Sequence, residues 1–338
     1  MIREAIAKLV DGAALTCGEA QATLAEIMGG EATPAQIAAF ITALRLRGET
    51  PEVIAGCARA MREKCTPVDA GGGIVVDTCG TGGDGAHTFN ISTASALVAA
   101  GAGVRVAKHG NRSVSSKCGS ADVLAELGVN LNASPAVMTE CLREIGIAFL
   151  FAPALHPAMK HAIGPRREIG IRTIFNILGP LSNPAGARHG VLGVYSRALV
   201  PVMAEAAAEL GAERLFVVHG SDGLDEITLT GPTFVGEVAE GRTRAYELTP
   251  DEAGLARCAP GDLAGGDARA NAEILRAILG GAPGPRRDIV LLNSAAAIVA
   301  GGMAAGFREG SEAAARSIDS GAAAAKLAAL AERTRPGV

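Results

Sequence analysis

Apolar residues over the first 66 positions recur at helical spacing, as in the run from Ile2 to Val10. Three sequences typical of helix N-termini follow: Thr16-x-x-Glu19, Thr33-Pro34 with Gln36, and Thr50-Pro51. The pattern predicts four helices that form a small all-helical N-terminal domain over residues 1–66. A glycine triplet at 71–73 then breaks the periodicity, so we expect a hinge near 67–73.

From residue 74 onward, short apolar runs alternate with helical patterns. The expected strands are 74–76, 104–107, 147–150, 190–195 and 214–218, and the expected helices are 92–101, 120–127, 135–145 and 198–210. This alternation is typical of a mainly parallel central sheet with helices on both faces. Short strands are expected next at 227–229, 233–238 and 244–248, as a hairpin-like excursion at the sheet edge, and the tail is helical at 269–279, 287–301 and in its Ala-rich end. We therefore expect a larger α/β domain over residues 74–338.

Composition excludes several classes of protein. Only 3% of residues are aromatic and the net charge is −4, which disfavours a nucleic-acid partner because stacking rings and a basic field are both lacking. No apolar run is long enough to span a bilayer, and the N-terminus does not resemble a signal peptide. Seven cysteines without C-x-x-C spacing fit free thiols in a reducing cytoplasm. We expect a cytoplasmic protein with no membrane partner.

A run of glycines follows the first expected strand. The sequence Gly80-Thr81-Gly82-Gly83-Asp84-Gly85 lets main-chain N–H groups approach a ligand without hindrance from Cβ, which suits an anion with many oxygens. The next helix, with Ser92 and Thr93 as its expected cap, adds an N-terminus that also favours anions. The pattern predicts a phosphate-binding segment, which we call the phosphate turn (residues 80–85).

Two other nucleotide-binding classes share part of this pattern. Gly80, Gly82 and Gly85 match G-x-G-x-x-G, the fingerprint of dinucleotide folds. In those folds the helix opens on the glycines and an acid ends the second strand, whereas about six residues intervene here and Lys108 ends that strand. The G-x-x-x-x-G-K-[ST] sequence of P-loop nucleotidases is absent. Both classes are disfavoured.

Cations and serines follow the second expected strand. Lys108, Arg112 and Lys117 lie in a segment that ends in Gly119-Ser120-Ala121-Asp122. Because α/β sheets bind ligands at the carboxyl ends of their strands, this segment predicts a flexible anion-binding loop beside the phosphate turn. A solvated polar turn is the alternative for any one of these residues. Ser120 also has the pattern of a helix N-cap.

Two adjacent carboxylates, Asp225 and Glu226, follow the strand expected at 214–218. Alone, such a pair is more often a solvated turn. Opposite two phosphate-binding segments, it offers the hard oxygen ligands that Mg²⁺ prefers. We call these two residues the acidic pair and expect them to bind Mg²⁺.

The segment 166–184 joins an Arg-rich helix end to a Gly/Pro-rich connector. We expect part of about 166–190 to pack onto the helical domain and a second hinge to lie at 166–184. Arg166 is then a candidate for a bidentate contact with a substrate carboxylate. Two further groups lack the spacing or the partner base that chemistry would need and are expected to be structural: His156, His161, His189 and His219, and the loop cysteines Cys79 and Cys118.

Six ordered segments carry a resemblance to a known family: Asp77 to Asp84, Thr88 to Thr93, Lys108 to Arg112, Gly119 to Asp122, Arg172 to Pro184 and Asp222 to Glu226. In these segments the chain resembles the anthranilate phosphoribosyltransferases of tryptophan biosynthesis, and the resemblance covers nearly its whole length. It implies a small helical domain hinged to a larger α/β domain, a homodimer through the helical domain, and Mg²⁺ as cofactor. Pro165 is a departure, since the family often has Val there.

The resemblance also implies substrates and residue roles. 5-Phosphoribosyl 1-diphosphate would contact Gly80, Gly83, Asp84, Thr88, Asn90, Ile91, Ser92, Thr93, Lys108, Asn111, Arg112, Ser115, Ser116 and Ser120. Anthranilate would contact Gly80, Asn111 and Arg166, and Mg²⁺ would contact Ser92, Asp225 and Glu226. The amine would displace diphosphate from ribose C1, with cations such as Lys108 stabilising the leaving group. His109 would either contact substrate or assist with the amine proton.

Two other functions fit the same architecture. A pyrimidine nucleoside phosphorylase would bind ribose and inorganic phosphate, but would not need two acidic metal ligands. A non-catalytic paralogue that binds nucleic acid would not need the complete set of site residues, and the net charge of −4 argues against it.

Overall fold

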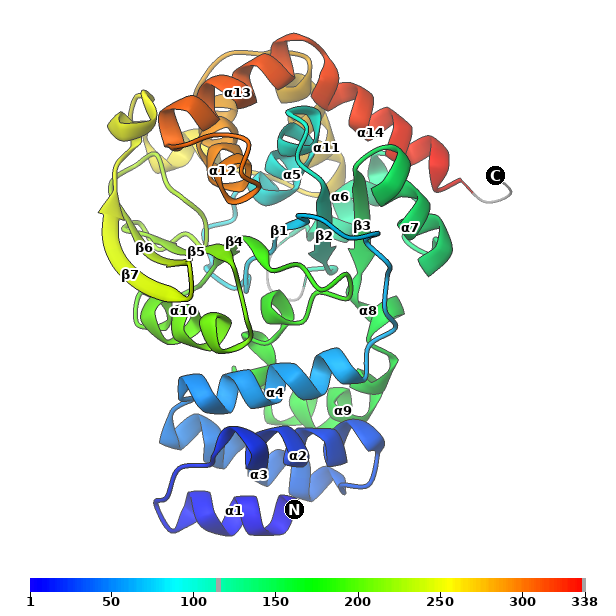
Figure 1. The fold of residues 1–338 in the computed structure, drawn as a ribbon, viewed down its shortest axis with the longest axis vertical. Helices are drawn as coiled ribbons and strands as arrows, with labels where there is room; N and C mark the ends of the chain where they lie inside the picture. The colour runs from blue at the N-terminus through cyan, green and yellow to red at the C-terminus, as the bar shows by residue number, and fades with distance from the viewer. Residues whose placement is uncertain (114–116, 336–338) are drawn as a thin grey trace.

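The computed structural model describes residues 1–113 and 117–335, and Figure 1 shows a helical part below a larger part built on a sheet. The helices are α1 (Ile2–Val10), α2 (Cys17–Gly29), α3 (Pro34–Arg47), α4 (Pro51–Glu63), α5 (Ile91–Gly101), α6 (Ser120–Glu126), α7 (Pro135–Glu144), α8 (Ala152–Leu155), α9 (Lys160–Ile169), α10 (Leu199–Glu209), α11 (Ala268–Leu279), α12 (Pro285–Ala300), α13 (Phe307–Asp319) and α14 (Ala322–Arg333). The strands are β1 (Val76–Thr78), β2 (Val106–Gly110), β3 (Ile147–Phe151), β4 (His189–Gly193), β5 (Arg214–Gly220), β6 (Thr233–Ala239) and β7 (Arg242–Leu248). Short 3₁₀ segments are η1 (Pro157–Met159), η2 (Ile174–Asn176), η3 (Gly179–Leu181), η4 (Pro250–Ala253) and η5 (Pro260–Leu263).

In the helical part, α2 and α3 each begin with a capping box. The Thr16 hydroxyl accepts the Glu19 N–H at 3.3 Å, and the Glu19 carboxylate accepts the Thr16 N–H at 2.7 Å. Thr33 and Gln36 make the same reciprocal pair, so both predicted helix starts are confirmed. Helix α2 packs on α4 and α1 packs on α3, while α9 returns from far along the chain to contact α2 and α3.

Across the described residues the sheet has seven strands in the order β3-β2-β1-β4-β5-β6-β7. The pairs from β3 to β5 are parallel, and β6 and β7 complete the sheet as an antiparallel hairpin. The predicted mainly parallel sheet is therefore confirmed. In the parallel part, the carboxyl ends of β1, β2, β4 and β5 all meet at one edge, where ligands of α/β sheets bind.

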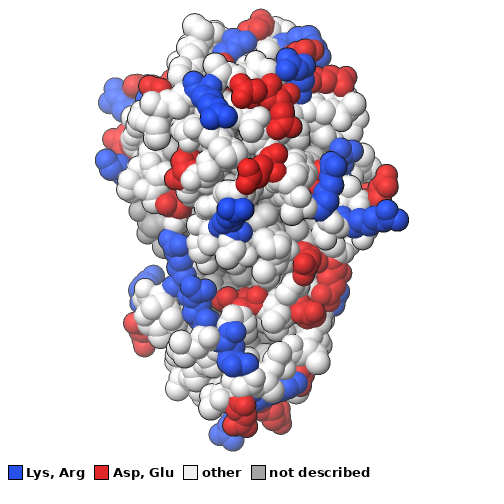
Figure 2. Space-filling model, turned by 90° about the vertical axis from the view of Figure 1, so that its left-hand side faces the viewer, with Lys and Arg blue, Asp and Glu red and all other residues white. Residues whose placement is uncertain are grey.

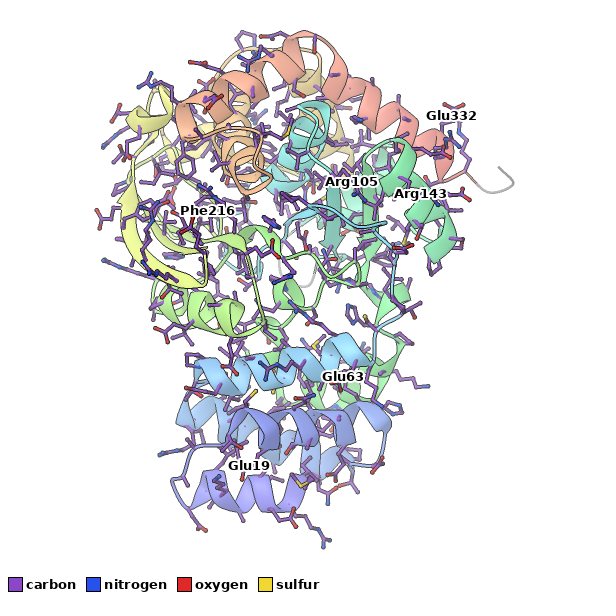
Figure 3. All side chains as sticks on the ribbon, in the orientation of Figure 1. Glu19, Glu63, Arg105, Arg143, Phe216 and Glu332 are labelled. Atoms are coloured by element: carbon purple, nitrogen blue, oxygen red, sulfur yellow. The ribbon has the colours of Figure 1, made fainter. Side chains whose placement is uncertain are left out.

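Two hydrophobic clusters cover opposite faces of the sheet. Along β5, Phe216 (labelled in Figure 3) belongs to the cluster with α5 and α12, and its neighbour Val217 belongs to the other cluster. This alternation is what a strand buried on both faces produces. The second cluster runs without interruption from Val217 through Met203 of α10 to Phe40 of α3, so the helical part shares its core with one face of the sheet.

Hydrogen bonds secure the segment that joins the two parts. The Thr66 N–H donates to the Leu155 carbonyl at 2.8 Å, and the Val68 N–H donates to the Pro184 carbonyl at 3.1 Å. The Arg105 guanidinium, labelled in Figure 3, donates to the carbonyls of Ala70 and Gly72. The link between the parts is thus tied to three other stretches of chain.

Three local predictions are wrong. Residues 227–229 form no strand, because Ile227 pairs with a side chain of α12 and the Thr228 N–H donates to the Thr233 hydroxyl. Helix α5 begins at Ile91 with Asn90 as its N-cap, ahead of the expected Ser92–Thr93 cap. Ser120 is the first residue of α6, and Gly119 holds the N-cap position. The tail is helical as expected, and it contains a further helix, α13, that the sequence pattern did not single out.

Charged side chains of both signs lie interspersed on the face drawn in Figure 2. None of the seven cysteines, all of which lie among the described residues, forms a disulfide there, in agreement with the expected thiols. Among the described helices, none combines the length and the apolar content that crossing a bilayer would require.

Candidate active site

The phosphate turn lies on the carboxyl end of β4. The Thr81 N–H donates to the Gly193 carbonyl at 2.8 Å, and the Thr81 hydroxyl accepts the Tyr195 N–H at 3.1 Å. Gly82, Gly83 and Gly85 have φ between +65° and +78°, a region that side chains with Cβ rarely adopt. The glycines are therefore required by the backbone path of the turn.

The acidic pair lies against this turn. The Gly82 N–H donates to Asp225 Oδ2 at 2.7 Å, and the Ser92 N–H at the start of α5 donates to Glu226 Oε1 at 3.0 Å. A Cβ added to Gly80 would lie 2.5 Å from Asp225 Oδ2, so only glycine permits this approach. Segments separated by more than a hundred residues thus meet, as the strand order predicts.

Three carboxylates (Asp84, Asp225 and Glu226) converge here, and none has a cationic side chain within ion-pair distance among the described residues. Burial raises the pKa of Asp225, and the nearby Asp84 carboxylate raises it further. Burial also raises the pKa of Glu226, with a further contribution from Asp225. Like charges held together favour a bound cation. The acidic pair, with the Ser92 hydroxyl close by, therefore fits a divalent cation that prefers oxygen ligands.

Lys108 is buried, and its ammonium is held inside the protein. It donates to the Thr78 carbonyl at 2.7 Å and to Ser92 Oγ at 3.3 Å. Lys108 thus connects β2 with β1 and with the N-terminus of α5. Its positive charge lies next to Ser92, on the side of the site where the Glu226 carboxylate is held.

The buried carboxylate of Asp77 organises the backbone behind Lys108. Its oxygens accept the His109 N–H at 3.0 Å and an Asn183 amide hydrogen at 2.7 Å. Burial raises the pKa of Asp77 to about 6, and the Lys108 charge opposes that shift. The carboxylate therefore joins β1 to β2 and to the connector (residues 170–188, between α9 and β4).

Among the described residues, ligand atoms of Asp77, Cys79 and His109 lie within 4.8 Å of one another, close enough to share an ion. The chemistry argues against a metal there. Both Asp77 oxygens already accept N–H groups, and burial raises the pKa of the Cys79 thiol, which stays protonated. Burial also raises the pKa of Cys118 to about 11. These shifts support the structural interpretation of both loop cysteines.

His109 faces a second buried histidine, His156, which the sequence analysis expected to be structural. The rings of His109 and His156 have centroids 5.1 Å apart. His109 Nδ1 is 3.1 Å from the Gly179 carbonyl, and the Nε2 atoms of both rings are buried without a partner among the described residues. Burial lowers the pKa of His109 to about 3 and that of His156 to about 4, so both rings are neutral at physiological pH.

The anion-binding loop is organised by Asp122, to which the sequence pattern assigned no separate role. Its carboxylate accepts the N–H groups of Ser113 and Gly119 and pairs with Arg112 at 2.8 Å. The Ser120 hydroxyl donates to the carbonyl of the exposed Asn111 at 3.2 Å. Of the expected loop residues, Ser115 and Ser116 lie outside the described residues.

Two arginines come from α9 and the connector, and one of them, Arg172, contacts the phosphate turn. The Arg166 guanidinium lies 5.0 Å from the centroid of the Phe175 ring, and burial lowers its pKa. No carboxylate pairs with Arg166 within residues 1–113 and 117–335. Arg172 donates to the Gly83 carbonyl of the phosphate turn and stacks over Tyr195 at 4.3 Å. Sequence reasoning assigned Arg172 no role of its own.

The residues before α5 are held by α11. Asn90 Oδ1 accepts an amide hydrogen of the buried Asn271 at 2.9 Å, and Asn90 Nδ2 donates to the Cys118 carbonyl at 3.2 Å. Thr88 makes a β-bridge with Ala264. Ile91 and Thr93 are buried, so their side chains face the interior. No local sequence pattern connects Asn271 to this site.

The fold and the site define a class of enzyme, and comparison with known proteins identifies it. Residues 3–65 match the helical bundle domain of a glycosyl transferase family, and residues 72–324 match the a/b domain of the same family. The chain belongs to this glycosyl transferase family.

Relatives of known activity narrow the assignment. The chain is 56% identical to the anthranilate phosphoribosyltransferase of Syntrophotalea carbinolica, over 99% of this chain and 100% of the relative, and 57% identical to that of Anaeromyxobacter dehalogenans, over 99% of each. Within the family, the chain thus belongs with the anthranilate phosphoribosyltransferases.

Solved structures agree with this placement. The anthranilate phosphoribosyltransferase of Thermus thermophilus superimposes with a TM-score of 0.93 at 45% identity, over 98% of this chain and 99% of that one. The Saccharomyces cerevisiae enzyme in complex with PRPP and Mg superimposes with a TM-score of 0.91 at 30% identity, over 98% of this chain and 97% of that one.

Proposed function

We propose that the chain transfers the phosphoribosyl group of 5-phosphoribosyl 1-diphosphate to the amine of anthranilate. The products are N-(5-phosphoribosyl)anthranilate and diphosphate, in the second step of tryptophan biosynthesis from chorismate. The observation that carries the proposal is the meeting of the phosphate turn, the N-terminus of α5 and the acidic pair at one sheet edge. Backbone donors beside carboxylates suit a diphosphate ester together with its metal ion.

The expected binding residues are assigned to two substrates. The diphosphate substrate contacts Gly80, Gly83, Asp84, Thr88, Asn90, Ile91, Ser92, Thr93, Lys108, Asn111, Arg112, Ser115, Ser116 and Ser120. Anthranilate contacts Gly80, Asn111 and Arg166. Among the described residues the half-buried guanidinium of Arg166 has no carboxylate partner, which supports its part of this assignment, since a partly desolvated cation gains from a carboxylate that binds two of its N–H groups.

Ser92, Asp225 and Glu226 hold Mg²⁺, which neutralises the departing diphosphate when bound. The raised pKa values of the two carboxylates support this assignment, because burial and then the neighbouring carboxylates disfavour their ionised forms, which a bound cation would stabilise. Lys108, tied to Ser92 Oγ, keeps a fixed positive charge on the same side of the site.

The rest of catalysis is positioning and exclusion of water. The aryl amine is already neutral, so attack at ribose C1 needs no strong base, and we expect a loose, oxocarbenium-like transition state. A histidine with a pKa of about 3 holds a proton poorly, which favours contact with substrate over proton acceptance for His109. Closure about hinges near 67–73 and 166–184 then keeps water from the activated ribose.

The assembly and location follow the same proposal. The protein acts in the cytoplasm, binds neither nucleic acid nor membrane, and forms a homodimer through the helical domain of residues 1–66. Val10 and Leu46, which are 72% and 82% exposed on that domain, support an apolar interface there.

The direct test follows anthranilate fluorescence in the presence of 5-phosphoribosyl 1-diphosphate and Mg²⁺. We expect fluorescence to fall with time, and to stay constant when the enzyme, 5-phosphoribosyl 1-diphosphate or Mg²⁺ is omitted. Phosphate-dependent cleavage of thymidine with no loss of anthranilate would instead identify a nucleoside phosphorylase. Salt-sensitive DNA binding without turnover would identify a non-catalytic paralogue.

A further inference from the structure

A buried asparagine on α12 forms hydrogen bonds with the main chain next to the acidic pair. Asn293 is 2% exposed. Its Oδ1 accepts the Ile227 N–H at 2.9 Å, and its Nδ2 donates to the Ile227 carbonyl at 2.8 Å. A second Nδ2 hydrogen bond, 2.9 Å long, ties the amide to the Ile289 carbonyl one turn earlier in α12. The side chain therefore takes the place that a neighbouring strand would have.

Ile227 directly follows Glu226, so this contact fixes the main chain immediately next to the acidic pair. Glu226 and Asn293 line the same small pocket, together with Gly80 and Ser92. Within that pocket, Glu226 Oε1 accepts the Ser92 N–H. The N-terminus of α5 thus holds the Glu226 carboxylate, and the Asn293 amide holds the main chain of the next residue, Ile227.

The segment has no freedom to move toward the sheet. A Cβ added to Gly193 would lie 1.6 Å from the Asp225 carbonyl oxygen, so the chain already presses against β4 there. Away from the sheet, α12 provides the opposing surface through Asn293. The segment with the acidic pair therefore lies between β4, where only glycine fits at position 193, and α12, which holds the Ile227 main chain through the Asn293 amide.

We propose that Asn293 is a positioning residue that holds Asp225 and Glu226 in the arrangement that binds a divalent cation. The inference rests on the proposed function, which assigns the metal to these carboxylates. The amide is suited to the task because it offers an acceptor and two donors, whereas Leu of similar size offers neither. Without it, the polar groups of the buried Ile227 backbone lose their partner, and the segment must shift to recover hydrogen bonds.

The test is binding of Mn²⁺ in the presence of diphosphate, followed by the electron paramagnetic resonance signal of the free ion. We expect Asn293→Leu to weaken Mn²⁺ binding by about tenfold or more, as loss of an outer-shell partner typically does. Asn293→Ser, which keeps one hydroxyl, is expected to lie between Leu and the natural residue. In assays of activity, the Mg²⁺ concentration for half-maximal rate should rise while the KM for anthranilate stays the same.

Ser294→Ala is the matched control. It removes a buried hydroxyl from the same helix, but that hydroxyl faces the Ser95 carbonyl and not the acidic pair. Melting temperatures show which variants are folded. If Asn293→Leu does not fold, the Mn²⁺ affinity of Asn293→Ser tests the inference in its place.

Unchanged Mn²⁺ affinity in a folded Asn293 variant, with affinity lost in Asp225→Asn/Glu226→Gln, overturns the inference and leaves the proposed metal site standing. Unchanged affinity in the double variant as well overturns both.

Discussion

Polar groups in the helical domain have partners within the protein, whereas several at the candidate site on the sheet edge have none within the described part of the chain. In the helical domain, Glu19 caps α2 and pairs with Lys8 at 2.7 Å, and these partners lower its pKa to about 2. At the sheet edge, burial and like charges raise the pKa values of Asp225 and Glu226. His109 and His156 each leave a buried ring nitrogen without a partner among the described residues.

This difference indicates that the polar groups of the helical domain contribute to stability, whereas those at the sheet edge are arranged for binding. In the helical domain Glu19 already has its partners, so its charge favours the folded chain without any ligand. At the sheet edge, several groups are arranged in a way that only a cation or a substrate would stabilise. Such arrangements cost stability and are retained where binding requires them. The four predictions below test this contrast.

The largest effect is expected from Asp225→Asn with Glu226→Gln. Removing both carboxylates removes the cation ligands, so turnover should fall by about 100-fold or more, since even outer-shell changes at metal sites cost about 10–100-fold. The melting temperature should stay the same or rise, because two repelling buried acids have become neutral. Steady-state rates and thermal unfolding measure the two effects. Glu19→Gln is the control, and a similar loss of turnover in it would remove the contrast.

Arg166→Ala should raise the KM for anthranilate by about tenfold, because a charge-assisted hydrogen bond contributes about 1.5–3 kcal/mol. The KM for 5-phosphoribosyl 1-diphosphate should change little. Arg167→Ala, the exposed neighbour on α9, is the matched control. Equal increases in both KM values would assign Arg166 to folding or to the hinge instead.

Thr16→Ala should lower the free energy of unfolding by about 1 kcal/mol, the usual effect of losing an N-cap side chain. Turnover should be unchanged, because Thr16 lies in the helical domain and makes its hydrogen bonds within α2. Urea denaturation and steady-state rates provide the two readings. Thr16→Ser keeps the hydroxyl and should behave like the natural protein, whereas slower turnover in Thr16→Ala would show that the two regions are coupled.

The smallest effect is a pH dependence of stability in the helical domain. Since folding lowers the pKa of Glu19 from 4.5 to about 2, the ionised form stabilises the folded state above pH 4.5, and this contribution is lost as the pH falls toward 2. The difference in urea midpoint between the natural protein and Glu19→Gln should therefore shrink as the pH falls from about 6 to about 3. A constant difference would mean that the Glu19 charge has no part in it.

Local features were predictable because each depends on residues that are close to it in the sequence. Thr16 and Glu19 form a capping box within four residues, and positive φ at Gly82 and Gly83 requires glycine whatever surrounds it. The alternation of short apolar runs with helices is enough to predict a parallel sheet, and the sheet then predicts which loops share an edge.

The prediction of a strand at 227–229 was wrong because its structure depends on a contact far away in the sequence. Its β-branched and apolar residues favour extended backbone, but a strand also needs a neighbour. Ile227 finds its partner in the Asn293 side chain, which is 66 residues away and on a helix. No periodicity within the segment can report such a contact.

Sequence alone determined the capped helices, the glycine path of the phosphate turn and the presence of carboxylates at a strand end, because each depends on neighbours in the chain. The tertiary structure decided which distant groups hold these parts. Asn293 beside Glu226, Arg172 on the Gly83 carbonyl and His156 facing His109 all follow from packing between segments remote in sequence. Burial by that packing also set the directions of the pKa shifts of Asp225, Glu226 and His109, since desolvation is a property of the folded surroundings and not of the residue.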